Sequence, residues 1–164
     1  MRKTRLYLDT SPIIMLEPDQ DPIRRAITEE FFRIVAERSD EYELFVSPMT
    51  IQELENAKTE ERRKSGRLLL ETFEHIKLPR SKEAENLAWI YVVDGVLSHN
   101  HIDDLTHVAY ATFFRCDYVI TWNMRHLANE RTFRRVGAVN TAENFGKIFL
   151  ATPEFFIGGQ VDEQ

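Results

Sequence analysis

The chain has 164 residues, of which 43% are apolar and 29% are charged, and its formal net charge is −6. This length and balance are typical of one water-soluble globular domain with its own core. No apolar stretch reaches the roughly 18 residues that a membrane-spanning helix needs, so we expect no membrane association. The negative charge argues against the salt-driven nucleic-acid binding of strongly basic proteins, but it does not exclude an enzyme that holds phosphate through a metal ion.

The N-terminal residues and the lone cysteine bear on the cellular compartment. Met1 to Arg5 is basic, but Asp9 interrupts the apolar stretch that follows, which excludes the core of a signal peptide and favours a cytoplasmic location. Cys116 has no partner for an internal disulfide, which suits a reducing compartment. We interpret it as a small buried hydrophobic residue without a catalytic role.

Short apolar or β-rich runs alternate along the chain with segments of helical periodicity. In chain order we expect a strand at 6–8, a helix from 12, a helix at 23–38, a strand at 42–46, a helix from 48, a helix at 60–73, a strand at 75–78, a helix at 81–97, a helix at 103–116, a strand at 118–121, a helix near 127–135 and a strand at 147–151. Such alternation requires crossover connections, so it predicts a three-layer α/β/α sandwich with a central, mainly parallel sheet. The domain should span residues 1–157, followed by a flexible tail at 158–164.

Two strand-to-helix junctions share one local signal. At the first, Ser11 is predicted to cap a helix whose first position is Pro12. At the second, Ser47 and Pro48 repeat the same arrangement. Helices therefore start at the edge where the strands end, which is the edge where parallel sheets bind their ligands.

Polar side chains are predicted to converge at this edge. Asp9 directly follows the first strand, and Asn123 follows the strand at 118–121. Glu53 and Asp104 lie on early turns of helices that begin at the same edge. Three carboxylates and an amide would then share one pocket, where the carboxylates repel one another unless a cation neutralises them. Hard oxygen ligands favour Mg²⁺ or Mn²⁺, and such an ion suits the hydrolysis of a phosphodiester.

Two of the carboxylates also have a purely structural interpretation. Asp9 could cap the helix that follows the first strand, because Asp is a preferred capping residue. Thr50 and Glu53 have the spacing of a capping box, although Pro48 places the start of the helix earlier than such a box requires.

The third acidic segment offers several candidates. One of Asp103 and Asp104 is expected only to favour the helix N-terminus, and we assign the pocket to Asp104 because it shares a helix face with His107. His107 is interpreted either as a partly buried, hydrogen-bonded histidine or as a residue that donates to Asp104 or a nearby acid; it is not predicted to bind metal. The pair His99 and His101 lacks further ligands at zinc spacing and is interpreted as a polar loop.

Four segments, taken in order, resemble the motifs of the PIN-domain family: Leu6 to Pro12, Ser47 to Leu54, Asp104 to Thr112, and Cys116 to Leu127 with its Thr-Trp-Asn-x-x-His pattern. The stretch from Ala151 to Glu154 resembles the closing strand. The resemblance implies a VapC-like toxin: a Mg²⁺- or Mn²⁺-dependent endoribonuclease, usually a homodimer and often silenced by a cognate antitoxin. It assigns Asp9, Glu53 and Asp104 as catalytic metal ligands and Asn123 as a fourth catalytic residue.

The chain departs from the fullest family pattern at Asn123, where many members carry Asp. An amide there can orient a water or contact a metal but adds no charge, so a second ion would bind weakly. Thr10, Arg125 and His126 are candidate substrate-binding residues, although solvation is an alternative for the last two. Trp122 is expected in the core or at a dimer surface. The neutral Asn123 also leaves open a catalytically weak PIN-like module that binds RNA or a protein.

Overall fold

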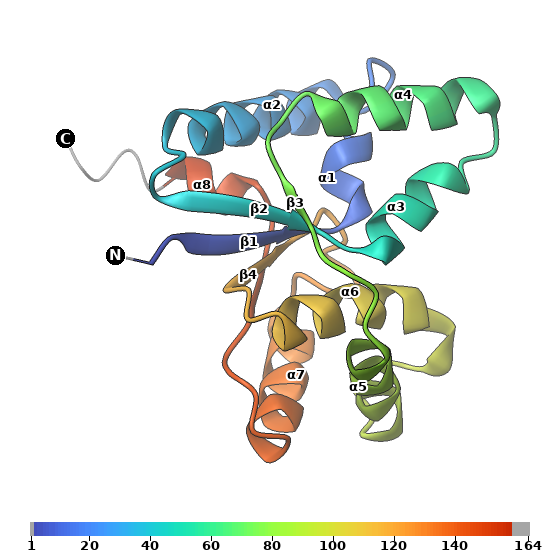
Figure 1. The fold of residues 1–164 in the computed structure, drawn as a ribbon, viewed down its shortest axis with the longest axis vertical. Coiled ribbons are helices and arrows are strands. Elements are labelled where there is room, and N and C mark those ends of the chain that lie inside the picture. Colours follow the sequence, from blue (N-terminus) through green and yellow to red (C-terminus); the bar gives the residue numbers. More distant parts are fainter. Residues whose placement is uncertain (1, 159–164) are drawn as a thin grey trace.

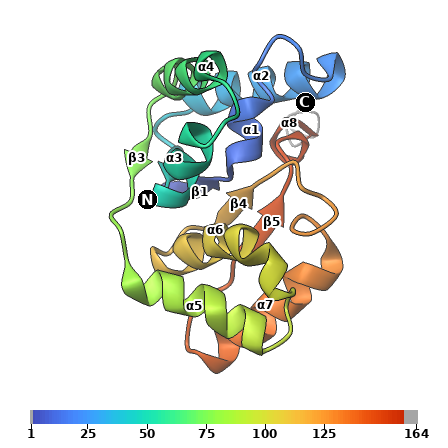
Figure 2. The ribbon, with the colours of Figure 1, turned by 90° about the vertical axis from the view of Figure 1, so that its right-hand side faces the viewer.

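The structure, a computed structural model, describes residues 2–158. One sheet of five strands, all paired in parallel, crosses the molecule in the order β3-β2-β1-β4-β5 (Figures 1 and 2). The strands are β1 (Thr4–Leu8), β2 (Tyr42–Val46), β3 (Ile76–Lys77), β4 (Tyr118–Ile120) and β5 (Phe149–Ala151). The predicted three-layer α/β/α sandwich with a parallel central sheet is confirmed.

Helices cover both faces of the sheet (Figures 1 and 2). One face carries α1 (Thr10–Ile14), α2 (Pro22–Glu37), α3 (Pro48–Glu55) and α4 (Glu60–Glu71), with α8 (Glu154–Gly158) beside α2; the other carries α5 (Lys82–Val93), α6 (Ile102–Phe113) and α7 (Glu130–Ala142). A short 3₁₀ helix, η1 (His99–His101), precedes α6. None of the helices within residues 2–158 has the length and apolar content to cross a membrane.

The two faces of β1 serve two separate cores. Leu6 and Leu8 belong to the core with α1 to α4, whereas Tyr7 belongs to the core with α5 to α7. This follows from the two-residue period of a strand, which sends neighbouring side chains to opposite faces. Tyr7 is fully buried, so its hydroxyl needs a partner inside the protein.

The first helix begins earlier than predicted, because Ser11 does not cap it. α1 starts at Thr10, with Asp9 in the N-cap position. The Ser11 hydroxyl instead donates to the Asp9 carboxylate at 2.8 Å and accepts from the Trp122 backbone N–H at 2.9 Å. The second junction agrees with the prediction: Ser47 caps α3 and forms a capping box with Thr50 rather than one between Thr50 and Glu53.

The helix predicted at 81–97 ends at Val93 instead. Gly95 has a φ of 79°, the left-handed conformation that terminates many helices and that glycine adopts without steric cost. The Val96 N–H then returns to the Tyr91 carbonyl at 2.9 Å, which closes the helix.

The C-terminal part also differs from the prediction. The helix expected near 127–135 runs from Glu130 to Ala142, because the Asn129 side chain caps it through the Thr132 N–H at 2.8 Å. The short helix α8 was not predicted; its Phe156 packs against aromatic rings of α2, β2 and β4, so tertiary contacts support it. Apart from its first residue, the tail expected at 158–164 lies outside the described residues.

Candidate metal centre at the carboxyl edge of the sheet

The candidate site lies where β1, β2 and β4 end side by side. Leu8 is in register with Ile120, and Tyr7 with Phe45, so the strands end at one level. The next residues, Asp9, Ser47 and Thr121, all contribute side chains to the hydrogen-bond network there. This is the edge at which the sequence predicted the pocket.

Asp9 is 5% exposed and is held by three side chains. Its Oδ2 accepts from Ser11 Oγ at 2.8 Å and from Thr121 Oγ1 at 2.7 Å, and its Oδ1 lies 3.1 Å from Nε2 of His107. Although Asp9 occupies the N-cap position of α1, its side chain makes no capping hydrogen bond. The capping interpretation of Asp9 is therefore wrong, and its carboxylate is oriented toward the site.

Glu53 comes from the second turn of α3 and reaches the same place. Its Oε1 accepts from Thr10 Oγ1 at 3.0 Å and also from Nε2 of His107. The side chain is about one-third exposed, at 34%, so its second oxygen can face a ligand. Thr10, which the sequence suggested as a substrate contact, is buried and directed at Glu53; its contact with substrate stays a prediction.

His107 lies beneath the two carboxylates with its side chain fully buried. Nε2 faces Asp9 and Glu53, and Nδ1 lies 2.6 Å from the hydroxyl of Tyr7. Burial by itself lowers the pKa of His107, but the Tyr7 oxygen and the two carboxylates outweigh it and raise that pKa well above 6.5. Of the sequence interpretations, donation to a nearby acid is the one that the geometry supports.

Asp104 and Asn123 form a second pair at the edge of the site. Asn123 Nδ2 donates to Asp104 Oδ2 at 3.3 Å, while Asn123 Oδ1 accepts from the His126 N–H at 3.0 Å. Burial, then the charge of Asp9 and that of Glu53, raise the pKa of Asp104. Because a carboxylate at position 123 would face Asp104 with like charge, the amide converts this contact into a hydrogen bond.

The remaining predicted residues lie farther out. The His126 ring sits 4.1 Å, centroid to centroid, from that of His101, and His101 Nδ1 lies 3.7 Å from Asp104 Oδ2. His101, interpreted from sequence as part of a polar loop, is thus a neighbour of the site. Arg125 is exposed to solvent. Its contact with substrate stays a prediction. Trp122 is buried and donates to Thr28 Oγ1 at 2.9 Å, which places it in the core.

Three of these side chains are arranged so that they could hold a metal ion. Ligand atoms of Asp9, Glu53 and His107 all lie within 4.8 Å of one another. The carboxylates of Asp9 and Glu53 meet here with Asp104 nearby, and a divalent cation would neutralise their negative charge. The pKa of Asp104 is raised first by burial and then by the charge of Asp9. The predicted ligand Asp104 is not a member of this close group, and His107 is.

Mg²⁺ is expected to stabilise the protein more at about pH 8.5 than at about pH 6. Without metal, the raised pKa of His107 means that the folded state keeps a proton that the unfolded state releases above pH 6.5. The free energy of unfolding therefore falls as the pH rises toward the folded pKa, by up to about 1.4 kcal/mol per pH unit. The raised pKa of Asp104 likewise makes the free energy of unfolding fall as pH rises, but at lower pH than for His107. A cation bound at Asp9 and Glu53 would take the place of the extra proton on His107. The increase in unfolding temperature on adding Mg²⁺, measured at both pH values, tests this prediction. An equal increase at the two pH values contradicts it, as does a His107→Gln variant that shows the same difference between the two pH values as the unaltered protein.

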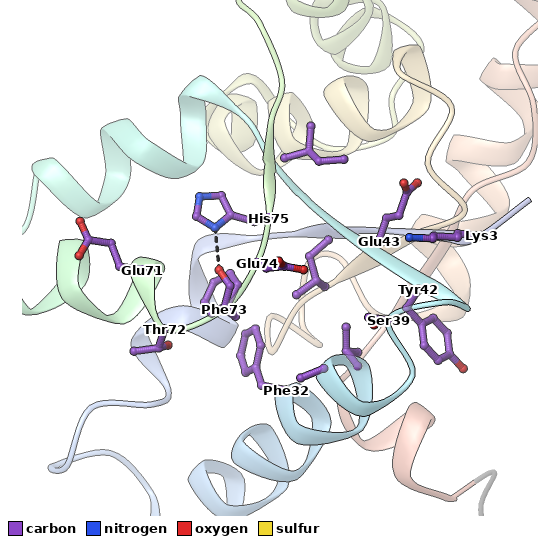
Figure 3. Close-up of a pocket in the computed structure, with 14 residues that line it drawn as sticks. Lys3, Phe32, Ser39, Tyr42, Glu43, Glu71, Thr72, Phe73, Glu74 and His75 are labelled. Carbon is purple, nitrogen blue, oxygen red and sulfur yellow. Dashed lines mark hydrogen bonds between the residues drawn. The ribbon is translucent and has the colours of Figure 1, made fainter.

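A hollow beside the helices that carry the acids reaches the site. This hollow, of about 1100 Å³, lies between α1, α3 and α4 and is lined by Glu53 together with Lys58 and Arg62. Another, of about 750 Å³, lies between α2, β2 and the segment that leads into β3, and is lined by residues such as Phe32 and His75 (Figure 3). None of the predicted site residues lines this second hollow.

Comparisons with known proteins agree with the fold. No protein-family model matches the sequence, and no curated protein matches it. Among solved structures, the chain is similar to a chain in the crystal structure of VapBC2 from Rickettsia felis bound to a DNA fragment from their promoter, with a TM-score of 0.57 and 13% sequence identity over 91% of this chain and 98% of that one. The likeness extends over nearly the whole of both chains, and at this identity it shows a shared PIN-like α/β/α fold.

Proposed function

We propose that this protein is a Mg²⁺- or Mn²⁺-dependent endoribonuclease of the PIN type. The observation that carries the proposal is the convergence of Asp9 and Glu53, with Asp104 nearby, at the carboxyl edge of a parallel sheet. The fold that the chain shares with a VapBC2 chain supports the same class. RNA, rather than DNA, follows from the resemblance of the sequence motifs to PIN-domain toxins.

In this proposal the carboxylates of Asp9, Glu53 and Asp104 hold the metal. Bound there, a divalent ion supplies a polarised water and a positive charge against the scissile phosphate. The protein's own part is to orient these ligands: Ser11 and Thr121 hold Asp9, and Thr10 holds Glu53. Substrate would approach along the hollow that Glu53 lines, where Lys58 offers positive charge. Arg62 lines the same hollow but is paired with Asp19 and Glu17.

Cleavage of an internally labelled single-stranded RNA tests the function. Protein stripped with EDTA is expected to be inactive, and Mg²⁺ or Mn²⁺ is expected to restore internal cuts in RNA but not in DNA of the same sequence. Heat-denatured protein with Mn²⁺ controls for hydrolysis by the metal alone. Activity that persists in EDTA contradicts the metal requirement, and cleavage of DNA alone contradicts the RNA assignment.

A second candidate function is favoured by one observation. Asn123 is neutral, so it adds no negative charge to the site. Both polar atoms of its side chain are already hydrogen-bonded, to Asp104 and to the His126 N–H. A weak module that binds RNA or a protein without cutting would fit this. RNA binding with no cleavage at saturating Mn²⁺ supports that function against the nuclease.

The proposed biological role is the toxin of a toxin–antitoxin pair, acting as a homodimer. The similar solved structure is of VapBC2, bound to DNA from their promoter, which supports a partner protein. On the surface of α5, Trp89 is 51% exposed and Val93 is 82% exposed, and exposed apolar patches commonly mark protein contacts. The neighbouring reading frame and the mass of the purified protein in solution test these two points.

A further inference from the structure

Tyr7 makes contacts that no sequence motif predicts. Its fully buried hydroxyl lies 2.6 Å from Ser47 Oγ, 2.6 Å from His107 Nδ1 and 3.3 Å from Thr50 Oγ1. Ser47 and Thr50 begin α3, the helix that carries Glu53, whereas His107 lies on α6, the helix that carries Asp104. One phenol therefore connects the three elements on which the candidate ligands lie.

The contacts around this phenol are mutually consistent. Thr50 Oγ1 donates to the Leu8 carbonyl at 3.1 Å, which ties the start of α3 to the end of β1. Ser47 Oγ accepts from the Met49 N–H at 3.1 Å, so its own hydrogen is available to Tyr7. Burial raises the pKa of Tyr7 above 10.0, and the phenol remains neutral and able to donate or accept.

His107 passes this positioning on to the carboxylates. Nε2 makes a hydrogen bond with Glu53 and lies 3.1 Å from Asp9 Oδ1. Because a carboxylate only accepts hydrogen bonds, Nε2 must carry the hydrogen. Nδ1 is occupied by Tyr7, which orients the ring so that Nε2 points at both acids. Asp9 and Glu53 are 44 positions apart in the chain, and His107 is the side chain that contacts both.

We propose that Tyr7 and His107 are positioning residues. Tyr7 fixes the His107 ring, whose Nε2–H is donated to Glu53 while the same nitrogen lies against Asp9, so that the two carboxylates stay close enough to share a bound cation. This inference rests on the proposed function, because it concerns the same carboxylates. It assigns His107 the role of a donor beneath the ligands rather than that of a ligand. Groups of this kind commonly change metal affinity or activity by roughly 10- to 100-fold when they are removed.

The Tyr7→Phe variant tests the proposal, and Tyr91→Phe is its matched control. Both tyrosines are fully buried, and the Tyr91 hydroxyl donates to Asn140 at 2.6 Å, away from the site. Both variants are expected to lower the unfolding temperature to a similar extent. Only Tyr7→Phe is expected to lower kcat by about 10- to 100-fold and Mn²⁺ affinity by about 10-fold, with KM for RNA changed less than about 2-fold.

A second pair of variants separates donation from packing. Gln in place of His107 retains a side-chain N–H that can reach Glu53, whereas Leu fills the space without a donor. We expect His107→Gln to retain more Mn²⁺ affinity and kcat than His107→Leu. Equal losses in the two variants overturn the proposal, as does a Tyr7→Phe variant that matches Tyr91→Phe in both quantities.

Failure of the inference and failure of the proposed function give different results. If the unaltered protein cleaves RNA and Tyr7→Phe cleaves equally well, the inference fails and the function stands. If the unaltered protein binds Mn²⁺ but cleaves no RNA, the function fails, and calorimetric Mn²⁺ affinities of the same variants still decide the inference.

Discussion

The Asp9→Asn variant is expected to lose RNA cleavage by about 1000-fold or more while it remains folded. Removing one ligand charge costs several kcal/mol of the transition-state stabilisation that a bound cation provides, and each 1.4 kcal/mol is about tenfold in rate. The amide oxygen can still accept from Ser11 and Thr121, as Oδ2 does now. Its NH₂ group would then face Nε2 of His107, so stability should fall slightly.

The matched control for this variant is Asp103→Asn. Asp103 is exposed on the first turn of α6, and its substitution changes the net charge by the same amount. Single-turnover cleavage at saturating Mn²⁺ and thermal unfolding of both variants give the comparison. Cleavage by Asp9→Asn within about tenfold of the unaltered protein would remove Asp9 from the metal site.

Glu53→Gln should cause a similar loss of cleavage with less effect on folding. The Gln carbonyl oxygen can accept from both Thr10 and His107, as Glu53 Oε1 does, so the hydrogen bonds remain and only the charge is lost. The loss in kcat is expected to be about 1000-fold, for the same reason as at Asp9. Mn²⁺ affinity, measured by calorimetry, should fall with it.

Glu55→Gln is the control on the same helix. Glu55 pairs with Arg67 at 2.6 Å near the surface, a contact that contributes about 0–1 kcal/mol, so its loss should leave cleavage unchanged. Equal cleavage by Glu53→Gln and Glu55→Gln would show that Glu53 binds no catalytic ion. A Glu53→Gln variant that unfolds instead would show that its charge is needed for the fold.

The general form of the fold could be predicted from local sequence patterns. Runs such as 42–46 carry the composition of a strand, and the Ser47-Pro48 pair marks the start of α3, because caps and proline act through the nearest backbone groups. The residues at which α5 ends and α7 begins were harder to predict. They depend on Gly95 adopting a positive φ and on Asn129 capping the helix.

The candidate site also has a part that could be predicted from the sequence and a part that could not. Its position at the carboxyl edge followed from the alternation of strands and helices, and Asp9, Glu53, Asp104 and Asn123 are brought to that edge. The partners of these residues did not follow. Tyr7 is read from sequence as one more apolar strand residue, and its contact with His107 joins positions 100 residues apart.

The sequence by itself determined the layers of the sandwich, the edge that carries the acids and the neutral residue at Asn123, because each depends on periodicity or on neighbours along the chain. Only the tertiary structure decided that His107, rather than Asp104, lies closest to Asp9 and Glu53, and that Tyr7 stands behind it. These choices depend on how β1, α3 and α6 pack against one another. Side chains a few ångströms apart in space but far apart in the chain leave no periodic signal.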